Sequence, residues 1–336
     1  MRRLYLILLC IVSVQFASCQ KDWIEIDVES AIEDFEIEET EYMAVFGDIQ
    51  YYTTSTYISL YQYSVDWLLR QKADGMNIKC VLHTGDICHQ TNALSCWNCF
   101  QGAMLVLSKK IPYYSMIGDH DYMWYDGTHI DGRNDTHFNE YVQFPLSAQN
   151  VIARFETGHM DNVVVKNIIQ GERLDLLILE FGPREEVVTW ANEYVKNHPD
   201  VNFIIMTHEY LEKGGGRRTV GLKSAARLRN TSYTTPEQLW DRLIKCNDNI
   251  RLVLCGHVGG LYALTIDTND FGREIPQIQH NIQSPDYRYD NWLMLWGFPA
   301  ESDSANVSIY NTRTRQYYNN QEVLFKFHYR DREANL

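Results

Sequence analysis

The sequence contains five places where a short apolar run ends in a small residue that is followed directly by an acid or a histidine. In chain order these are Phe46-Gly47-Asp48-Ile49-Gln50, Thr84-Gly85-Asp86-Ile87-Cys88-His89, Ile117-Gly118-Asp119-His120-Asp121, Met206-Thr207-His208-Glu209 and Cys255-Gly256-His257-Val258-Gly259. Carboxylates together with imidazoles suit manganese, iron or zinc better than calcium. A single Gly-Asp is usually a turn, and a single such histidine is usually a hydrogen-bonded polar residue. The whole series instead predicts a hydrolytic site with two divalent ions.

These side chains can meet only if the apolar runs are neighbouring strands, because ligands collect at the carboxyl ends of strands in α/β sheets. The runs predict buried strands over residues 42–46, 78–82, 113–117, 174–179, 203–206 and 252–254. Helical spacing predicts helices over 57–72, 93–108, 185–196 and 236–245. Paired β-like runs over 151–169 and 277–327 have no helices between them, so we expect mixed sheets in a layered α/β fold.

The order of the motifs resembles the calcineurin-like metallophosphoesterase superfamily, whose pattern is DxH, GDxx, GNH(D/E), a single histidine and GHxH. The resemblance implies an α/β fold of four layers, a two-sheet β-sandwich flanked by helices, over residues 42–330. It also implies hydrolysis of phosphate monoesters or diesters by a metal-activated hydroxide. By position, the ligands of the first ion would be Asp48, Gln50 and Asp86. Those of the second ion would be Asp86, Asp119, His208 and His257, so that Asp86 bridges the two ions.

The sequence also departs from the family pattern. Gln50 stands where the family has histidine, Asp119 where it has asparagine, and Gly259 where it has the final histidine. The first site therefore loses two imidazoles, and the second site is the better furnished. His89 lies three residues after Asp86, where purple acid phosphatases have a tyrosine ligand. It either restores an imidazole to the first ion or is a hydrogen-bonding loop histidine.

Other residues of the motifs and loops are candidates for catalysis and substrate binding. We expect His120 to be the general acid, or a donor to a phosphoryl oxygen, with Asp121 holding its tautomer. Four further side chains are candidate substrate contacts, and an ordinary loop or packing role is their alternative: Arg217 and Arg218 in a Gly-rich loop, and Tyr51 and Tyr122 beside the motifs. Trp124 and Tyr125 follow the third motif and are further aromatic candidates.

The composition supports a large folded core and argues against one class of partner. The chain of 336 residues is 45% hydrophobic, and its 44 acidic residues outnumber its 30 basic ones. An acidic chain of this kind offers no positive field for nonspecific nucleic-acid binding, so we expect bound cations to attract a phosphorylated small-molecule or phosphoester substrate.

The N-terminus has the pattern of an export signal: two arginines, an apolar run and small residues before Cys19. We expect residues 1–19 to be a signal peptide, and residues 20–41 to be an acidic tether or edge segment. Cys19 resembles the lipid-carrying cysteine of a bacterial lipoprotein signal. The sequence therefore predicts an exported protein, either a periplasmic or cell-surface lipoprotein anchored to the membrane through Cys19, or a secreted protein. The Cys96-Trp97-Asn98-Cys99 motif lacks a second CxxC, which leaves a local disulfide or ordinary buried thiols.

Two other functions remain open. A degenerate member of the superfamily would bind one ion, with a phosphorylated ligand but without useful turnover, and Gln50 and Gly259 favour it. An exported module that only binds partners would leave the acids and histidines at the strand ends unexplained.

Overall fold

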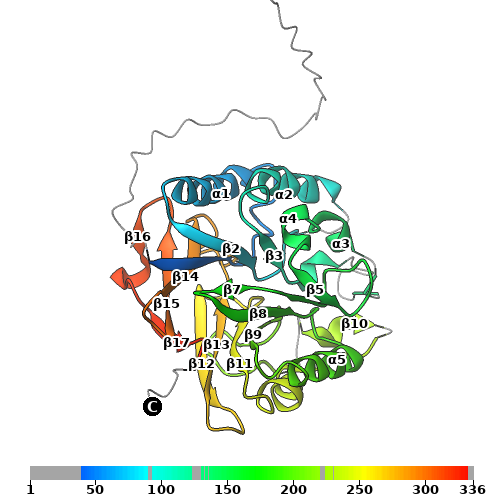
Figure 1. Ribbon diagram of the computed structural model, residues 1–336. Helices are drawn as coiled ribbons and strands as arrows, with labels where there is room; N and C mark the ends of the chain where they lie inside the picture. The colour runs from blue at the N-terminus through cyan, green and yellow to red at the C-terminus, as the bar shows by residue number, and fades with distance from the viewer. Residues whose placement is uncertain are drawn as a thin grey trace, which may run out of the picture. The chain divides into compact units, whose positions relative to one another are not determined.

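The computed structural model describes residues 39–89, 93–122, 130–131, 133–134, 136–219, 224–229 and 231–331. Two mixed β-sheets lie against each other, and helices cover the outer face of each sheet (Figure 1). This arrangement confirms the fold predicted from the sequence. The predicted signal segment with Cys19, the acidic stretch up to residue 38, and Trp124 and Tyr125 lie outside the described residues.

The first sheet has the strand order β16-β15-β14-β1-β2-β3, and β17 also pairs with β15. Its strands are β1 (Thr40–Phe46), β2 (Asn77–His83), β3 (Tyr113–Ser115), β14 (Trp292–Pro299), β15 (Ser304–Asn311), β16 (Gln316–Tyr317) and β17 (Phe325–His328). The strands β1, β2 and β3 are parallel, and α1 (Ile58–Ala73) and α2 (Leu94–Leu107) connect them. Buried residues of α1 recur at helical spacing, as Tyr61, Val65 and Leu68 do, so one face of the helix covers the sheet.

The second sheet has the strand order β12-β13-β11-β9-β8-β6-β5, and β7 also pairs with β8. Its strands are β5 (Val151–Arg154), β6 (Val163–Val165), β7 (Ile168–Ile169), β8 (Glu172–Ile178), β9 (Asn202–Met206), β11 (Ile250–Cys255), β12 (Tyr262–Thr268) and β13 (Glu274–His280). The central strands β8, β9, β11 and β13 are parallel. All residues of β11 are buried, as expected of a central parallel strand that is covered on both faces.

The remaining helices and several short elements complete the described fold. They are α3 (Phe138–Tyr141), α4 (Pro145–Ala148), α5 (Glu185–Lys196), α6 (Pro236–Leu239), a π-helical turn (Trp240–Ile244), 3₁₀ turns at Asp119–Asp121, Ala225–Arg227 and Tyr318–Asn320, and the parallel pair β4 (Ile130–Asp131) and β10 (Leu228–Arg229). One hydrophobic cluster joins the facing sides of the two sheets with α1 and α2. A second cluster lies between the second sheet and α5 and α6. Strands held in this way give a rigid base to the loops at their ends.

The structure corrects three details of the predicted elements. The strand predicted to reach residue 117 ends at Ser115. The helix predicted over 236–245 starts at Pro236, where the Thr235 side chain caps it, but it is α-helical only to Leu239 and then forms the π-helical turn. The strand β12 was not predicted, because it lies at an edge of the sheet and its partly exposed residues include Thr265 and Asp267 instead of an apolar run.

The last described residues connect the two sheets. The strand β17 pairs with β15 of the first sheet, and the Tyr329 ring packs edge-on against Phe298 at 5.1 Å between ring centroids. Two residues later, the Asp331 Oδ2 atom lies 2.7 Å from the Arg251 Nη2 atom of β11 in the second sheet. The Asp331 Oδ1 atom lies 2.9 Å from Arg273 Nη1.

No disulfide joins the cysteines that the structure describes, and Cys96 and Cys99 of α2 are buried thiols. Of the two alternatives for this CxxC motif, the structure therefore shows buried thiols. Among the helices that the structure describes, none is both long enough and apolar enough to cross a bilayer.

Candidate metal centre

The predicted ligands lie at the carboxyl ends of strands from both sheets. Asp48, Asp86 and Asp119 follow β1, β2 and β3, and His208 and His257 follow β9 and β11. Because the two sheets face each other, five loops that are distant in the sequence meet at one edge of the sandwich. The sequence prediction that these strand ends are neighbours is consistent with this arrangement.

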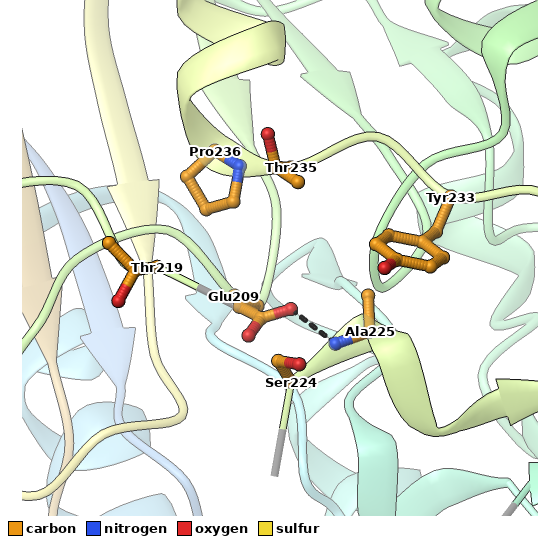
Figure 2. Close-up of a pocket in the computed structure, with 7 residues that line it drawn as sticks. All are labelled: Glu209, Thr219, Ser224, Ala225, Tyr233, Thr235 and Pro236. Atoms are coloured by element: carbon orange, nitrogen blue, oxygen red, sulfur yellow. Dashed lines mark hydrogen bonds between the residues drawn. The ribbon is translucent and has the colours of Figure 1, made fainter. Parts of the chain in front are cut away.

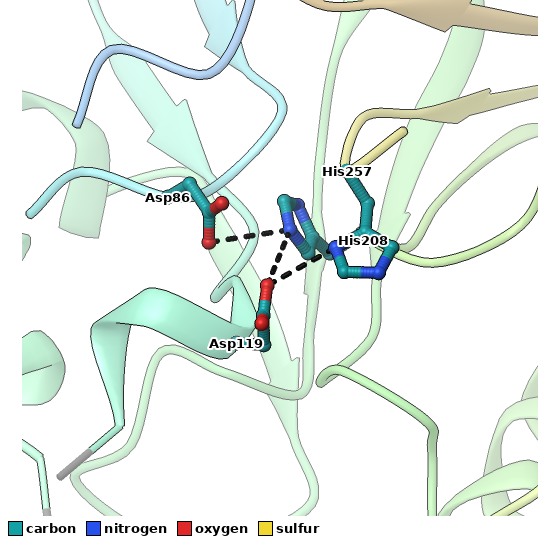
Figure 3. A group of neighbouring side chains, drawn as sticks. All are labelled: Asp86, Asp119, His208 and His257. Carbon is teal, nitrogen blue, oxygen red and sulfur yellow. Dashed lines mark ion pairs between the residues drawn. The ribbon is translucent and has the colours of Figure 1, made fainter. Parts of the chain in front are cut away.

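Four of these side chains form a compact buried cluster (Figure 3). Asp86, Asp119, His208 and His257 each offer one ligand atom, and these atoms lie within 4.8 Å of one another. The His208 Nε2 atom is 3.2 Å from Asp86 Oδ1 and 3.4 Å from Asp119 Oδ1. The His257 Nδ1 atom is 3.0 Å from Asp119 Oδ1. Two carboxylates and two imidazoles at these separations are a donor set that manganese, iron or zinc accepts.

The backbone around the cluster has little freedom. Asp86 and His257 adopt positive φ angles of 54° and 76°, which residues with a side chain rarely do. A Cβ atom on Gly118 would overlap the Asp86 carboxylate and lie 2.9 Å from His208 Nε2. A side chain at this glycine would therefore occupy the space of the ligand atoms themselves.

Two buried atoms of the cluster lack a hydrogen-bond partner, which is the condition expected of metal ligands. The His208 Nδ1 atom lies 2.6 Å from the carbonyl oxygen of Thr84, so Nδ1 carries the proton that it donates there. The Nε2 atom faces the cluster, where neither His208 Nε2 nor Asp119 Oδ1 has a hydrogen-bond partner, and loss of the proton from Nε2 would free its lone pair for an ion. The residues present therefore fit a divalent ion.

The charges of the cluster in the absence of an ion compensate one another. Burial alone would lower the pKa of His208, but the carboxylates of Asp86 and Asp119 raise this pKa well above its usual value. Burial would also lower the pKa of His257, but the Asp119 carboxylate raises it. Although burial acts against it, the two imidazoles hold the pKa of Asp119 well below its usual value. Without an ion, the protons on the two histidines balance the carboxylates, and an ion can replace these protons.

Asp48 and Gln50, the ligands predicted for the first ion, lie beside this cluster. The Gln50 Nε2 atom donates to Asp86 Oδ2 at 2.9 Å. The Asp48 carboxylate accepts a hydrogen bond from the backbone nitrogen of His257 at 2.9 Å and one from the Thr84 hydroxyl at 2.8 Å. Burial raises the pKa of Asp48 to about 7. Their role as metal ligands stays a prediction.

His120, the predicted general acid, lies beside the cluster. Its backbone nitrogen donates to Asp86 Oδ1 at 3.0 Å, and its Nδ1 atom lies 3.1 Å from the carbonyl oxygen of His89. Burial would lower the pKa of His120, but the charges of Asp86 and Asp119 raise it. The ring is therefore held next to the ligands in a state that favours a proton, although its catalytic role stays a prediction.

Asp121 joins two of the ligand loops. Its Oδ1 atom accepts from the backbone nitrogens of Ile87 at 2.8 Å and Cys88 at 3.1 Å, and its Oδ2 atom accepts from Gly118 at 2.9 Å. Burial and the nearby charge of Asp86 raise the pKa of Asp121 to about 7. These bonds fix the loops that follow β2 and β3, and the role predicted for Asp121, orienting the His120 ring, stays a prediction.

His89, the proposed substitute ligand, lies in a row of stacked side chains. Its ring centroid is 5.2 Å from that of His120 on one side and 4.8 Å from that of Tyr51 on the other. The Arg288 guanidinium lies 4.1 Å above the Tyr51 ring and extends the row. In this structure, His89 packs against both His120 and Tyr51. The roles of His89 as a ligand and of Tyr51 as a substrate contact remain predictions.

The other predicted substrate contacts have protein partners. Arg217 pairs with Glu237 and Asp267 and lies 4.6 Å from the Trp240 ring. The Arg218 Nε atom lies 2.8 Å from Glu209 Oε1. Tyr122 is fully buried, as in the alternative in which its ring packs under a loop. Glu209 also accepts from the Ala225 backbone and lines a cavity of about 10 Å³, which has room for about one water molecule (Figure 2).

Sequence reasoning missed Arg227 and Gln283. The Arg227 Nη1 atom lies 3.4 Å from Asp119 Oδ2, and its side chain is 16% exposed, so it brings a positive charge to the edge of the cluster. The Gln283 Nε2 atom donates to Asp48 Oδ2 at 3.1 Å. Neither residue belongs to a strand-end motif, and the sequence contains no local signal that would have identified them.

Comparison with known proteins identifies the family. The family model described as calcineurin-like phosphoesterase matches residues 43–260, and the chain belongs to this family. The family predicted from the motifs is thereby confirmed. The protein YvnB of Bacillus subtilis (strain 168), described as uncharacterized, is 28% identical over 283 residues, which cover 81% of this chain and 20% of YvnB. The chain thus spans about a fifth of the length of this relative.

A solved structure of purple acid phosphatase PPD1 from yellow lupin (Lupinus luteus) seeds is similar in fold. The TM-score is 0.52 at 13% sequence identity, and the match covers 83% of this chain and 53% of the lupin chain. The chain therefore spans about half the length of this phosphatase. This likeness concerns the fold, whereas the family together with the cluster of acids and histidines supports divalent metal binding.

Proposed function

We propose that this protein hydrolyses phosphate monoesters or diesters at the centre formed by Asp86, Asp119, His208 and His257. The observation that carries the proposal is the convergence of these four buried side chains, with His208 Nε2 and Asp119 Oδ1 left without hydrogen-bond partners. A divalent ion held there would lower the pKa of a water molecule and stabilise the negative charge that develops at phosphorus.

The residues around the centre have distinct parts in this reaction. Arg227 faces Asp119 from the edge of the cluster, where its guanidinium can bind two oxygens of a phosphoryl group at once. His120 is held between His89 and Asp86 with a raised pKa, so it can donate a proton to the leaving oxygen. Asp121 fixes the loops that carry Asp86 and Asp119 and thereby keeps the ligands in place.

The test is turnover of chromogenic phosphomonoesters and phosphodiesters with manganese or zinc, together with the metal content of the protein. We expect hydrolysis by the metal-loaded protein, and the loss of both bound metal and hydrolysis in His257→Ala. His328→Ala is the matched control, because the His328 side chain is 71% exposed and lies on β17. A protein that binds metal but turns over neither ester class would contradict the proposal.

A second candidate function is a single-ion member that binds a phosphorylated ligand without useful turnover. The hydrogen bond from Gln50 to Asp86 favours it, because an amide then lies where the family pattern has an imidazole. Retention of a phosphorylated ligand or inorganic phosphate by metal-loaded protein that lacks turnover would support this candidate.

We also propose that the protein is exported through residues 1–19 and carries a lipid on Cys19. The supports are the charged start, the apolar run and the small residues before Cys19. Expression of the full chain in a bacterium, followed by mass spectrometry of the mature N-terminus, tests both steps. An intact Met1 in the purified protein would contradict export.

A further inference from the structure

A continuous row of hydrogen bonds occupies the place of the first ion. Asp48 and Asp86 are the two carboxylates that remain there from the family pattern, and the side chains of Gln283 and Gln50 connect them. Gln283 Nε2 donates to Asp48 Oδ2 at 3.1 Å, Gln50 Nε2 donates to Gln283 Oε1 at 2.9 Å, and Gln50 Nε2 also donates to Asp86 Oδ2 at 2.9 Å. Two neutral amides thus link two carboxylates.

The oxygens of both carboxylates already accept other hydrogen bonds. Asp48 Oδ2 also accepts from the backbone nitrogen of His257 and from Asn281 Nδ2 at 3.0 Å, while Asp48 Oδ1 accepts from the Thr84 hydroxyl. On the other side, Asp86 Oδ1 accepts from the backbone nitrogen of His120. Asp48, Asp86 and Gln50 are almost completely buried, so these donors are not replaced by water without rearrangement.

The orientation of the Gln50 amide follows from its neighbours. Its nitrogen lies between two acceptors, Asp86 Oδ2 and Gln283 Oε1. Turning the amide by 180° would place its oxygen against both of these oxygens, so the nitrogen is the atom that faces them. Gln50 is therefore a donor in this row through its nitrogen, while its buried Oε1 atom has no hydrogen-bond partner.

The segment that carries Gln283 is itself fixed. Gln283 Nε2 also donates to the carbonyl oxygen of His257 at 2.8 Å, and the backbone nitrogen of Gln283 donates to Asn281 Oδ1 at 2.8 Å. Arg288 Nε donates to the carbonyl oxygen of Gln283 at 2.9 Å. An ion between Asp48 and Asp86 would have to displace an amide that these contacts hold, and it would leave buried donors without acceptors.

We propose that this protein holds a single divalent ion, at Asp86, Asp119, His208 and His257, and that the Gln50–Gln283 amide pair takes the place of the first ion. The proposal deepens the proposed function and rests on its metal centre. In the two-ion pattern a cation binds both carboxylates. Here the N–H groups of the two neutral amides bind them instead, by hydrogen bonds. Gln283 is thus a positioning residue, which acts through Asp48 and Gln50.

The test is the number of ions per chain, measured by elemental analysis after manganese or zinc loading. Wild type should hold one ion and give the six-line electron paramagnetic resonance signal of isolated manganese. The triple variant Gln50→His/Gly259→His/Gln283→Ala restores both imidazoles of the pattern and removes the displacing amide. A Cβ atom at Gly259 meets no atom within 4 Å, so a histidine has room there. The triple variant should hold two ions and give the signal of a coupled manganese pair.

Gln321→Ala is the matched control, because Gln321 is exposed and it should leave the count at one. Gln283→Glu keeps the shape of the side chain but supplies an extra carboxylate, so it should raise the count above one if the triple variant does not fold. Two ions in wild type, or one ion in every folded variant, would overturn the proposal. No bound ion in wild type would instead overturn the metal centre, whereas one ion without turnover would contradict only the proposed hydrolysis.

Discussion

At the scale of single residues, the site contains some side chains that the sequence motifs predict and others that they do not. Asp86, Asp119, His208 and His257 each follow an apolar run, so local spacing in the sequence is sufficient to identify them. Arg227 lies in a 3₁₀ turn without a motif, and its distance of 3.4 Å from Asp119 depends on how two loops meet. Such a contact is a property of the tertiary structure and could not be predicted from spacing.

Arg227 should contribute to turnover without holding the ion. Because its guanidinium faces Asp119 and can bind a phosphoryl group, Arg227→Ala should lower kcat/KM about 10- to 100-fold, which corresponds to one or two charged hydrogen bonds. Arg227→Lys should recover only part of this loss, because an ammonium group cannot form the paired contact. The measurement is steady-state kinetics together with metal content. A variant with lost metal, or with unchanged kinetics, would show that Arg227 has another role.

Metal affinity should increase with pH. The carboxylates raise the pKa values of His208 and His257, so when no ion is bound both rings keep a proton to a higher pH than a free histidine does. An ion must displace these protons, and its apparent affinity therefore falls as the pH falls below neutrality, by about tenfold per pH unit for each proton displaced. Calorimetry of manganese binding in two buffers with different ionisation enthalpies measures the protons released. Equal affinities at pH 6 and pH 8 would be incompatible with this expectation.

At the scale of elements, the turns after the strands determine the site as much as the strands do. The buried apolar runs predicted β1, β2, β9 and β11 well, because each is covered on both faces. The edge strand β12 escaped prediction, since half-exposed polar residues carry little periodic signal. Gln283 lies 233 residues from Gln50, and only the pairing of β14 with β1 and of β13 with β11 brings its segment to the site.

Gly118 should be needed both for the metal centre and for the close approach of the Asp86 backbone, whose nitrogen a Cβ atom at this position would overlap. In Gly118→Ala, the new methyl group would overlap the Asp86 carboxylate and crowd His208 Nε2, so metal affinity should fall at least tenfold. Gly102→Ala is the matched control: Gly102 lies within α2, where a Cβ atom meets nothing within 4 Å. This control should keep the affinity and stabilise the protein by about 0.5–1 kcal/mol. The measurements are calorimetric metal titration and urea unfolding, and similar metal affinities for the two variants would contradict the argument.

At the scale of the whole molecule, buried titratable groups link stability to pH. His83 and His280 are fully buried in the described structure. Burial lowers the pKa of His83 to about 3 and that of His280 to about 4. The unfolded chain binds a proton at each histidine below about pH 6.5, whereas the folded protein does not. Between these pH values the unfolded state therefore gains protons, and each histidine destabilises the fold as the pH falls.

His280→Gln should remove one of these dependences. Glutamine can still donate to the carbonyl oxygen of Leu261, which lies 3.0 Å from His280 Nδ1, but it takes up no proton. From pH 6.5 to pH 4.5, the free energy of unfolding should fall less in the variant than in wild type, by about 2–3 kcal/mol. Urea unfolding at several pH values gives this difference directly. Parallel curves for the two proteins would show that His280 is not kept neutral by the fold.

The ion pairs between Asp331 and two arginines of the second sheet help to hold the two sheets together. They link the two sheets at the end of the described chain, because β17, which ends three residues earlier, belongs to the first sheet. A protein shortened after His328 would lose these ion pairs and the packing of Tyr329 on Phe298, while the hydrophobic cluster between the sheets would still join them. Because the ligands come from both sheets, every contact that joins the sheets also helps to hold the ligand loops against each other.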